Sequence, residues 1–153
     1  MSLTDQLQAD MKTAMRDGDT QRRDTLRMVI AAAQNAAKEK RQPLSDDEAL
    51  DVINREVKKR RESIAAFRAA GRDDLADKEQ AEIDVLDPYL PAQLGEDEVR
   101  ALVVEAIAAT AASSPRDMGR VMSQLMPTVK GRADGRLVSS LVNQELAKVA
   151  QSE

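Results

Sequence analysis

Apolar residues recur at the three- and four-residue spacing of an α-helix along almost the whole chain, and no segment alternates as a strand does. Ala, Leu, Glu, Lys, Arg and Gln, which favour helices most strongly, are abundant throughout. Glycine and proline interrupt the pattern at a few places: Gly18, Pro43, Gly71, residues 87–95, Pro115 and residues 130–135. The sequence therefore predicts an all-α fold of seven helices.

The longest interruption, residues 87–95, contains two prolines and a glycine and divides the chain into two parts. Four helices are predicted before it, over about residues 3–17, 20–41, 46–70 and 73–86. Three more are predicted after it, with apolar rows that begin at Val99, Met118 and Leu137. We therefore expect an N-terminal four-helix domain at residues 1–92 and a C-terminal three-helix domain at residues 96–153.

The chain contains no Cys and no His, and its only aromatic residues are Phe67 and Tyr89. Disulfides, Cys or His metal sites, haem ligation and nucleophiles activated by His are therefore excluded. Two aromatic side chains cannot form a stacking platform for nucleic-acid bases. The acidic residues lack metal-ligand spacing and the glycines form no phosphate-binding loop, so we expect neither a metal ion nor a cofactor.

The charge and the N-terminus bear on partners and location. The formal net charge is −4, so contact with nucleic acid requires a local basic patch. The first residues have no basic start and no apolar run of signal-peptide length, and no stretch is long and apolar enough to span a membrane. Together with the absence of Cys, these features predict a cytoplasmic protein without membrane partners.

A charged residue interrupts the apolar row of the third predicted helix. The row has coiled-coil-like spacing and consists of Leu50, Ile53, Val57, Arg60, Ile64 and Phe67. If the next helix folds back at Gly71, Arg60 and Glu82 are nearly equidistant from the turn. One interpretation is that Arg60 extends its stem along the edge of the core. The other is a structural ion pair with Glu82 or Glu79 that fixes the register of the two helices.

Basic residues gather in two segments. Residues 55–61 hold five basic residues and one acidic residue, which is typical of a solvated helix face or of a surface that contacts phosphates. Lys130, Arg132 and Arg136 bracket a glycine turn and a helix N-terminus, where backbone N–H groups favour anions, and Arg120 lies nearby. We expect these four residues to bind RNA. Against this, Asp134 can cap the helix itself, and the charges can simply be solubilising.

Several motifs resemble those of the YqeY-like family, and together they cover nearly the whole chain. In the N-terminal part they are Lys58-x-Arg60, Glu62-Ser63, Phe67, Ala70-Gly71-Arg72-x-Asp74-Leu75, Glu79, Glu82-Ile83 and Tyr89-Leu90-Pro91. In the C-terminal part they are Met118-Gly119-x-Val121-Met122 and Lys130-Gly131-Arg132-Ala133-Asp134-Gly135. The C-terminal half also resembles the tail domain of the B subunit of the glutamyl-tRNA(Gln)/aspartyl-tRNA(Asn) amidotransferase. Gly95 departs from the serine expected before the fifth helix.

The resemblance implies a two-part helical fold and an association with amidation that uses glutamine as nitrogen donor. In the multi-subunit enzyme the tail domain helps to hold tRNA while other parts perform the chemistry. The chain therefore resembles a tRNA-binding or tRNA-amidotransferase-associated protein, with tRNA or an amidotransferase or aminoacyl-tRNA synthetase complex as partner. Two alternatives stay open: a carbon–nitrogen ligase, for which this sequence shows no catalytic set, and a protein–protein adaptor.

Overall fold

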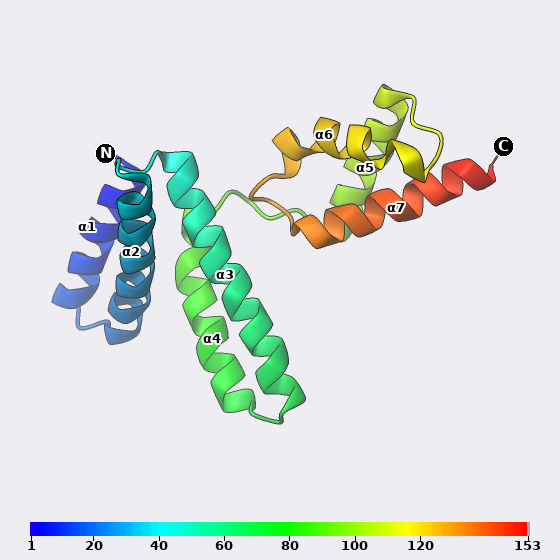
Figure 1. Ribbon diagram of the computed structural model, residues 1–153. Helices are drawn as coiled ribbons and strands as arrows, with labels where there is room; N and C mark the ends of the chain where they lie inside the picture. Colours follow the sequence, from blue (N-terminus) through cyan, green and yellow to red (C-terminus); the bar gives the residue numbers. More distant parts are fainter. Residues whose placement is uncertain (153) are drawn as a thin grey trace. The chain divides into compact units, whose positions relative to one another are not determined.

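The computed structural model describes residues 1–152, and within them it contains seven α-helices, two short 3-10 helices and no strand (Figure 1). The prediction of an all-α fold is therefore confirmed. The α-helices are α1 (Leu3–Arg16), α2 (Thr20–Lys40), α3 (Asp46–Ala69), α4 (Asp73–Leu86), α5 (Glu96–Thr110), α6 (Met118–Val129) and α7 (Gly135–Gln151). The 3-10 helices are η1 (Asp87–Tyr89) and η2 (Pro115–Asp117).

The chain divides into two compact units at the peptide bond between Leu90 and Pro91. The first unit contains α1 to α4, and the second contains α5 to α7. Each unit has its own cluster of buried apolar side chains. The boundary lies inside the proline-containing segment 87–95. That residues 1–92 and 96–153 fold as independent domains stays a prediction.

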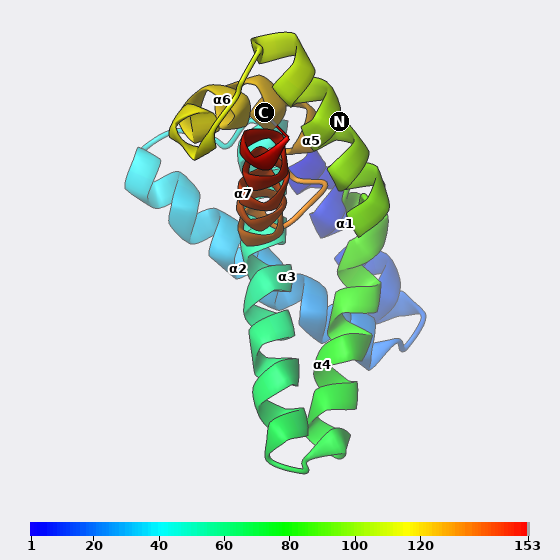
Figure 2. The same cartoon turned by 90° about the vertical axis from the view of Figure 1, so that its right-hand side faces the viewer.

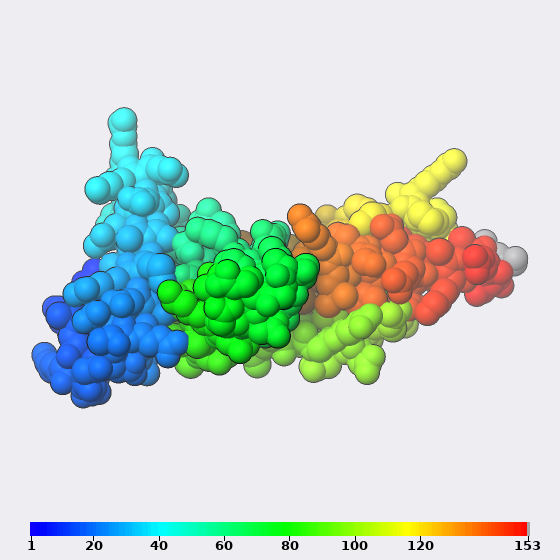
Figure 3. Space-filling view, turned by 90° about the horizontal axis from the view of Figure 1, so that it is seen from below, coloured from blue at the N-terminus to red at the C-terminus, as the bar shows by residue number. Residues whose placement is uncertain are grey.

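Two helical hairpins build the first unit. Helices α1 and α2 form one hairpin, and α3 and α4 lie side by side as the other in both ribbon views (Figures 1 and 2). Gly71 closes the second hairpin with φ +73°, a conformation that costs glycine little. The closed end of this hairpin faces the viewer as the green surface in Figure 3. The hairpins share a core that includes Leu7, Leu26, Ile53 and Leu86.

Local capping explains where these helices begin. The hydroxyls of Ser2 and Ser45 accept the backbone N–H groups of Asp5 and Glu48, and both acidic side chains accept the serine N–H groups in return. Glu48 also pairs with the Lys40 ammonium, which donates to it at 2.5 Å. These hydrogen bonds, first that from Lys40, lower the pKa of Glu48 to about 2. The reciprocal caps satisfy donors that a helix start leaves without partners.

The second unit has a short 3-10 turn before α6, at a Ser-Pro pair that is typical of the start of an α-helix. Ser114 and Pro115 open the short 3-10 helix η2, and α6 begins only at Met118. The carboxylate of Asp117 accepts the N–H of Ser113 at 2.8 Å, so the acid and not the serine hydroxyl anchors this turn.

An ion pair joins the first and last helices of the second unit. Arg100 of α5 donates to Glu145 of α7 at 2.8 Å.

Candidate functional site

Arg60 lies between three helices of the first unit and is only 6% exposed. The apolar stripe of α3 places it there, because Ile53 and Val57 of the same stripe are fully buried. Helix α4 supplies Glu82, and α2 supplies Met28. A fully charged guanidinium in this position needs nearby acceptors to offset the loss of its water.

Two carboxylates and a backbone carbonyl provide those acceptors. Arg60 Nε donates to Glu82 Oε2 at 2.9 Å, across the two helices. Arg60 Nη1 donates to Glu56 Oε2 at 2.9 Å and to the Glu56 carbonyl oxygen at 3.0 Å. The remaining nitrogen, Nη2, has only the Met28 sulfur as partner, at 3.8 Å. The guanidinium therefore ties α3 to α4 and to its own preceding turn, and it contacts α2 through a thioether.

A surface pocket of about 430 Å³ opens beside this cluster. Its lining consists of Met28, Ala31, Glu56, Lys59, Arg60, Ser63, Glu79 and Glu82. Glu79 lies one turn before Glu82 on α4 and does not bond to Arg60. Burial and then the neighbouring Glu82 carboxylate raise the pKa of Glu79, while the charge of Arg60 opposes that rise. The pocket thus combines a buried cation with three carboxylates.

Sequence reasoning did not anticipate Glu56 or Met28 as contacts of Arg60. Glu56 could have been found, because Glu and Arg four residues apart on a helix face each other. Met28 could not, because its contact depends on how α2 packs against the α3–α4 hairpin. The pocket is therefore a tertiary feature. The sequence shows the charged position in the apolar row and, by counting from Gly71, Glu82 as its partner.

The basic turn between α6 and α7 is held in place by the segment that precedes α5. The N–H of Leu94 donates to the Arg132 carbonyl oxygen at 2.8 Å, and the Gln93 side chain donates to the Gly131 carbonyl oxygen at 3.0 Å. Arg132 Nε donates to the Ala92 carbonyl oxygen at 3.2 Å. Gly131, with φ +75°, makes the sharp bend. Arg132 therefore has a local structural contact in addition to its charge.

The other predicted RNA-binding residues differ in their surroundings. Lys130 and Arg136 are exposed on either side of the turn. Arg120 is exposed but pairs with Asp117 at 2.9 Å, which offsets its charge. Asp134 caps α7, because its Oδ1 accepts the N–H of Arg136 at 2.8 Å. A donor of this helix start is thus occupied by the protein itself, and anion binding here depends on the side chains.

The basic segment of α3 lies mostly in solvent. Arg55, Lys58, Lys59 and Arg61 are exposed, whereas Arg60 is buried. Lys59 has a long ion pair of 3.6 Å with Glu56. Exposed cations of this kind keep their water and add little to stability. The four side chains form a solvated face, and Arg60 of the same run belongs to the interior.

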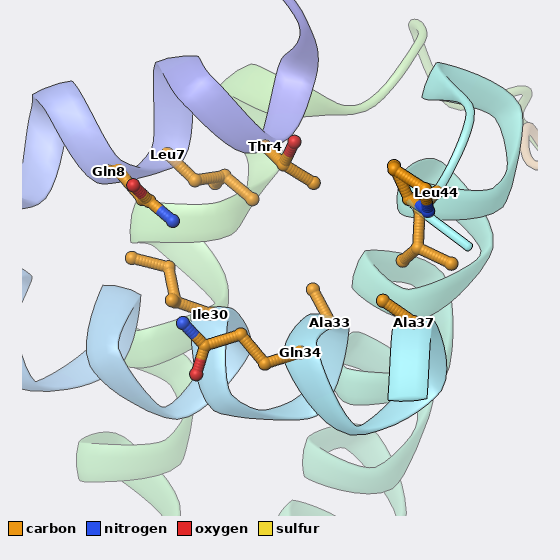
Figure 4. A pocket seen from close by; sticks show the side chains of 9 residues that line it. Thr4, Leu7, Gln8, Ile30, Ala33, Gln34, Ala37 and Leu44 are labelled. Atoms are coloured by element: carbon orange, nitrogen blue, oxygen red, sulfur yellow. The ribbon is translucent and has the colours of Figure 1, made fainter. Parts of the chain in front are cut away.

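A smaller pocket of about 170 Å³ lies between α1 and α2 and has no charged residue in its lining (Figure 4). Leu7 and Ala33 form its buried floor, and Leu44 from the α2–α3 loop closes one side. Gln8 and Gln34 are exposed at its edge. Alanines at 33 and 37, one turn apart, leave the space that a larger side chain would fill.

Filling this pocket is expected to stabilise the first unit. The Ala37→Leu variant places a leucine over the apolar floor, and we expect its free energy of unfolding to rise by about 1 kcal/mol. Chemical denaturation followed by Tyr89 fluorescence reports the first unit alone, because Tyr89 is the chain's single tyrosine and there is no Trp. Ala65→Leu, on an exposed position of α3, is the control. An equal gain in both variants would show that added apolar surface in general, not the filling of this pocket, causes the effect.

Among residues 1–152, no three His, Cys, Asp or Glu side chains are grouped so that they could hold a metal ion. In the same residues, no helix combines the length and apolar character needed to cross a membrane.

Comparison with known proteins gives matches over nearly the full length. The sequence matches the family described as "Yqey-like protein" over residues 4–146. The protein named "Altered inheritance of mitochondria protein 41, mitochondrial" from Pyrenophora tritici-repentis is 38% identical over 143 residues, covering 90% of this chain and 77% of that protein. The protein of the same name from Kluyveromyces lactis is 30% identical over 152 residues, covering 95% and 82%. The match to the Eremothecium gossypii protein is 38% identical over 87 residues and covers 56% of this chain and 48% of that protein.

The expected cytoplasmic location is wrong on this comparison, because these relatives are named as mitochondrial proteins. The features behind that expectation, the absence of Cys and the composition of the first residues, do not separate the cytoplasm from a mitochondrial compartment. The relatives' names mention neither tRNA nor amidation. The family match extends through both helical units, and two relatives align with nine-tenths or more of the chain. The chain belongs to the YqeY-like family.

Proposed function

We propose that the second unit binds a structured RNA, with transfer RNA as the first candidate, through the α6–α7 turn. One observation carries the proposal: within seven positions the turn holds Lys130, Arg132 and Arg136, with Asp134 as the single acidic residue among them. Lys130 and Arg136 are exposed, so they can approach phosphates without rearrangement of the core. Cations that replace counterions on phosphates supply most of the sequence-independent affinity for nucleic acid.

The rigidity of the turn supports this proposal. Hydrogen bonds from residues 92–94, together with the Arg132 contact to the Ala92 carbonyl, fix its backbone before any partner arrives. A preordered site loses less conformational entropy on binding than a flexible loop. The contacts to the segment before α5 therefore favour binding as well as folding.

The composition of the second unit indicates which RNA features it can contact. Phe67 and Tyr89 both precede Pro91, so the second unit has no aromatic side chain to stack on bases. Contacts are then limited to phosphates and sugar hydroxyls, which favours a folded RNA over a single strand. Sequence-specific readout of bases is not expected from such a surface.

The test is a titration of labelled tRNA at several salt concentrations. Reversing the two exposed charges in Lys130→Glu/Arg136→Glu should weaken binding at least tenfold and lower the slope of log affinity against log salt by about 2. Lys12→Glu/Lys38→Glu changes the net charge equally on exposed positions of the first unit and is the matched control. Arg132 is left in place because of its contact with Ala92.

Two outcomes would contradict this proposal. Equal binding by both double variants would show that the turn is not the contact surface. No measurable binding by the unchanged protein would show that it is not an autonomous RNA-binding module, and the adaptor function would then be the better explanation. Loss of binding in the turn variant alone supports the proposal.

The purified chain is also expected to release no ammonia from glutamine and to amidate no carboxylate with ATP. It contains no Cys or His and no glycine-rich phosphate loop for such chemistry. An association with amidation would then consist of holding tRNA for a partner enzyme. Glutaminase and ATPase assays on the purified protein test this, and activity abolished by a single substitution in the chain would contradict it.

A further inference from the structure

The pocket beside Arg60 contains a hydrogen-bond donor that lacks a strong acceptor. The side chain is 6% exposed, and its Nε and Nη1 atoms donate to carboxylate and carbonyl oxygens. Its Nη2 donates only to the Met28 sulfur at 3.8 Å. A thioether is a weak acceptor, so a charged N–H group in this position would gain from a ligand oxygen.

The same pocket contains an acidic group that forms no ion pair with the protein's described residues. Within residues 1–152, no Lys or Arg forms an ion pair with Glu79, although Glu79 lines the pocket with Arg60 and Lys59. Burial and the Glu82 carboxylate raise the pKa of Glu79, and the charges of Arg60 and Lys78 oppose this rise without cancelling it. A ligand ammonium group beside Glu79 would therefore be favoured.

We propose that this pocket binds a small zwitterion with a carboxylate and an ammonium group, the chemical class of the free amino acids. The ligand carboxylate replaces the Met28 sulfur at Arg60 Nη2, and the ligand ammonium pairs with Glu79. The local charges favour this class, because Arg60 and Lys59 face three carboxylates, Glu56, Glu79 and Glu82. A simple anion would meet an excess of negative charge, and a simple cation would leave Arg60 Nη2 without an oxygen.

The volume of the pocket and the flexible Met28 side chain in its lining fit such a ligand. Its volume of about 430 Å³ accommodates a molecule of a few heavy atoms together with water. Met28 is 44% exposed, and an unbranched, flexible side chain can move aside at small cost. Because the pocket is open to solvent and the ligand is small, we expect a dissociation constant on the order of 1 mM.

A titration of the full chain, monitored by the methyl NMR signal of Met28, tests the proposal directly. Met28→Leu identifies the signal among the seven methionines. The three probes are L-alanine, propionate and ethylamine, which present both charged groups, the anion alone and the cation alone. We expect L-alanine to shift the Met28 signal with saturation and the other two to cause at most a small shift. A saturating shift with propionate or ethylamine equal to that with L-alanine, or no shift with any probe, would overturn the proposal.

Two matched variants of α4 locate the ammonium contact. Glu79→Gln removes the carboxylate in the pocket, whereas Asp84→Asn removes an exposed carboxylate of the same helix outside it. We expect Glu79→Gln to weaken L-alanine binding about tenfold and Asp84→Asn to leave it unchanged. Equal affinities in the two variants would contradict the assignment of Glu79. Neither variant alters the α6–α7 turn, so failure here is distinct from failure to bind RNA.

Discussion

The Arg60→Met variant is expected to lose about 3 kcal/mol of the free energy of unfolding of the first unit. Methionine keeps the apolar stem but removes the charge, which leaves the Glu56 and Glu82 carboxylates largely buried without their cation. Removing one partner of such a pair costs more than the pair itself contributes, because the remaining charge has lost its water. Urea denaturation followed by Tyr89 fluorescence measures the change in the first unit.

Two further variants separate charge from packing at this position. Arg61→Met makes the same substitution at the neighbouring exposed position of α3 and should change stability by less than about 0.5 kcal/mol. Adding Glu56→Gln and Glu82→Gln to Arg60→Met should restore part of the lost stability, since the two carboxylates that paired with Arg60 are then neutral amides. An Arg60→Met protein that unfolds at the same urea concentration as the unchanged chain would contradict a stabilising role for the ion pair.

The single tyrosine is expected to ionise near pH 12 in the folded protein. The Tyr89 hydroxyl donates to Asp10 Oδ2 at 2.5 Å and joins η1 to α1. Burial, and next the hydrogen bond to Asp10, raise the pKa of Tyr89 from 10.0 to about 12, against the opposing effect of Arg22. Because the chain contains no Trp and no other Tyr, the absorbance of tyrosinate during an alkaline titration reports this group alone.

The direction of the effect on stability follows from the two pKa values. An acid whose pKa is higher in the folded state favours folding while it is protonated, so this contribution is complete below pH 10 and decreases as the pH rises toward 12. Tyr89→Phe should remove that part of the pH dependence. Asp10→Asn should lower the pKa only part of the way to 10, because burial remains. Ionisation of Tyr89 at pH 10 in the folded chain would show that the phenol is neither buried nor bonded to Asp10.

Local features of the fold were predictable because their causes lie within a few residues. The serine caps at Ser2 and Ser45 depend on side chains three positions away, and the turn at Gly71 depends on one positive φ. Pro115 shows the limit: a serine before a proline is typical of a helix start, but the Asp117 carboxylate takes the serine N–H groups and a 3-10 turn forms first. The sequence pattern alone does not show whether the Ser114 hydroxyl or the Asp117 carboxylate makes the capping hydrogen bond.

The candidate sites were predictable only in part, because they combine residues from several elements. Arg60 stands out as a charge in an apolar row, and counting from Gly71 indicates Glu82. The pocket beside them requires Met28 from α2, whose position depends on packing between the hairpins. In the second unit, the basic turn is visible as a charge cluster, but the contact of Arg132 with Ala92 joins segments forty residues apart. A charged side chain that makes a structural contact and one that is exposed to solvent cannot be told apart in a sequence.

The hydrogen bonds between residues 92–94 and the α6–α7 turn also set the length of the tether between the two units. Leu90 packs against the first core, whereas Ala92 is bonded to the second unit, so little chain remains between the two. Pro91 further restricts the backbone of the residue before it. The backbone that belongs to neither set of contacts is therefore little longer than Pro91 itself.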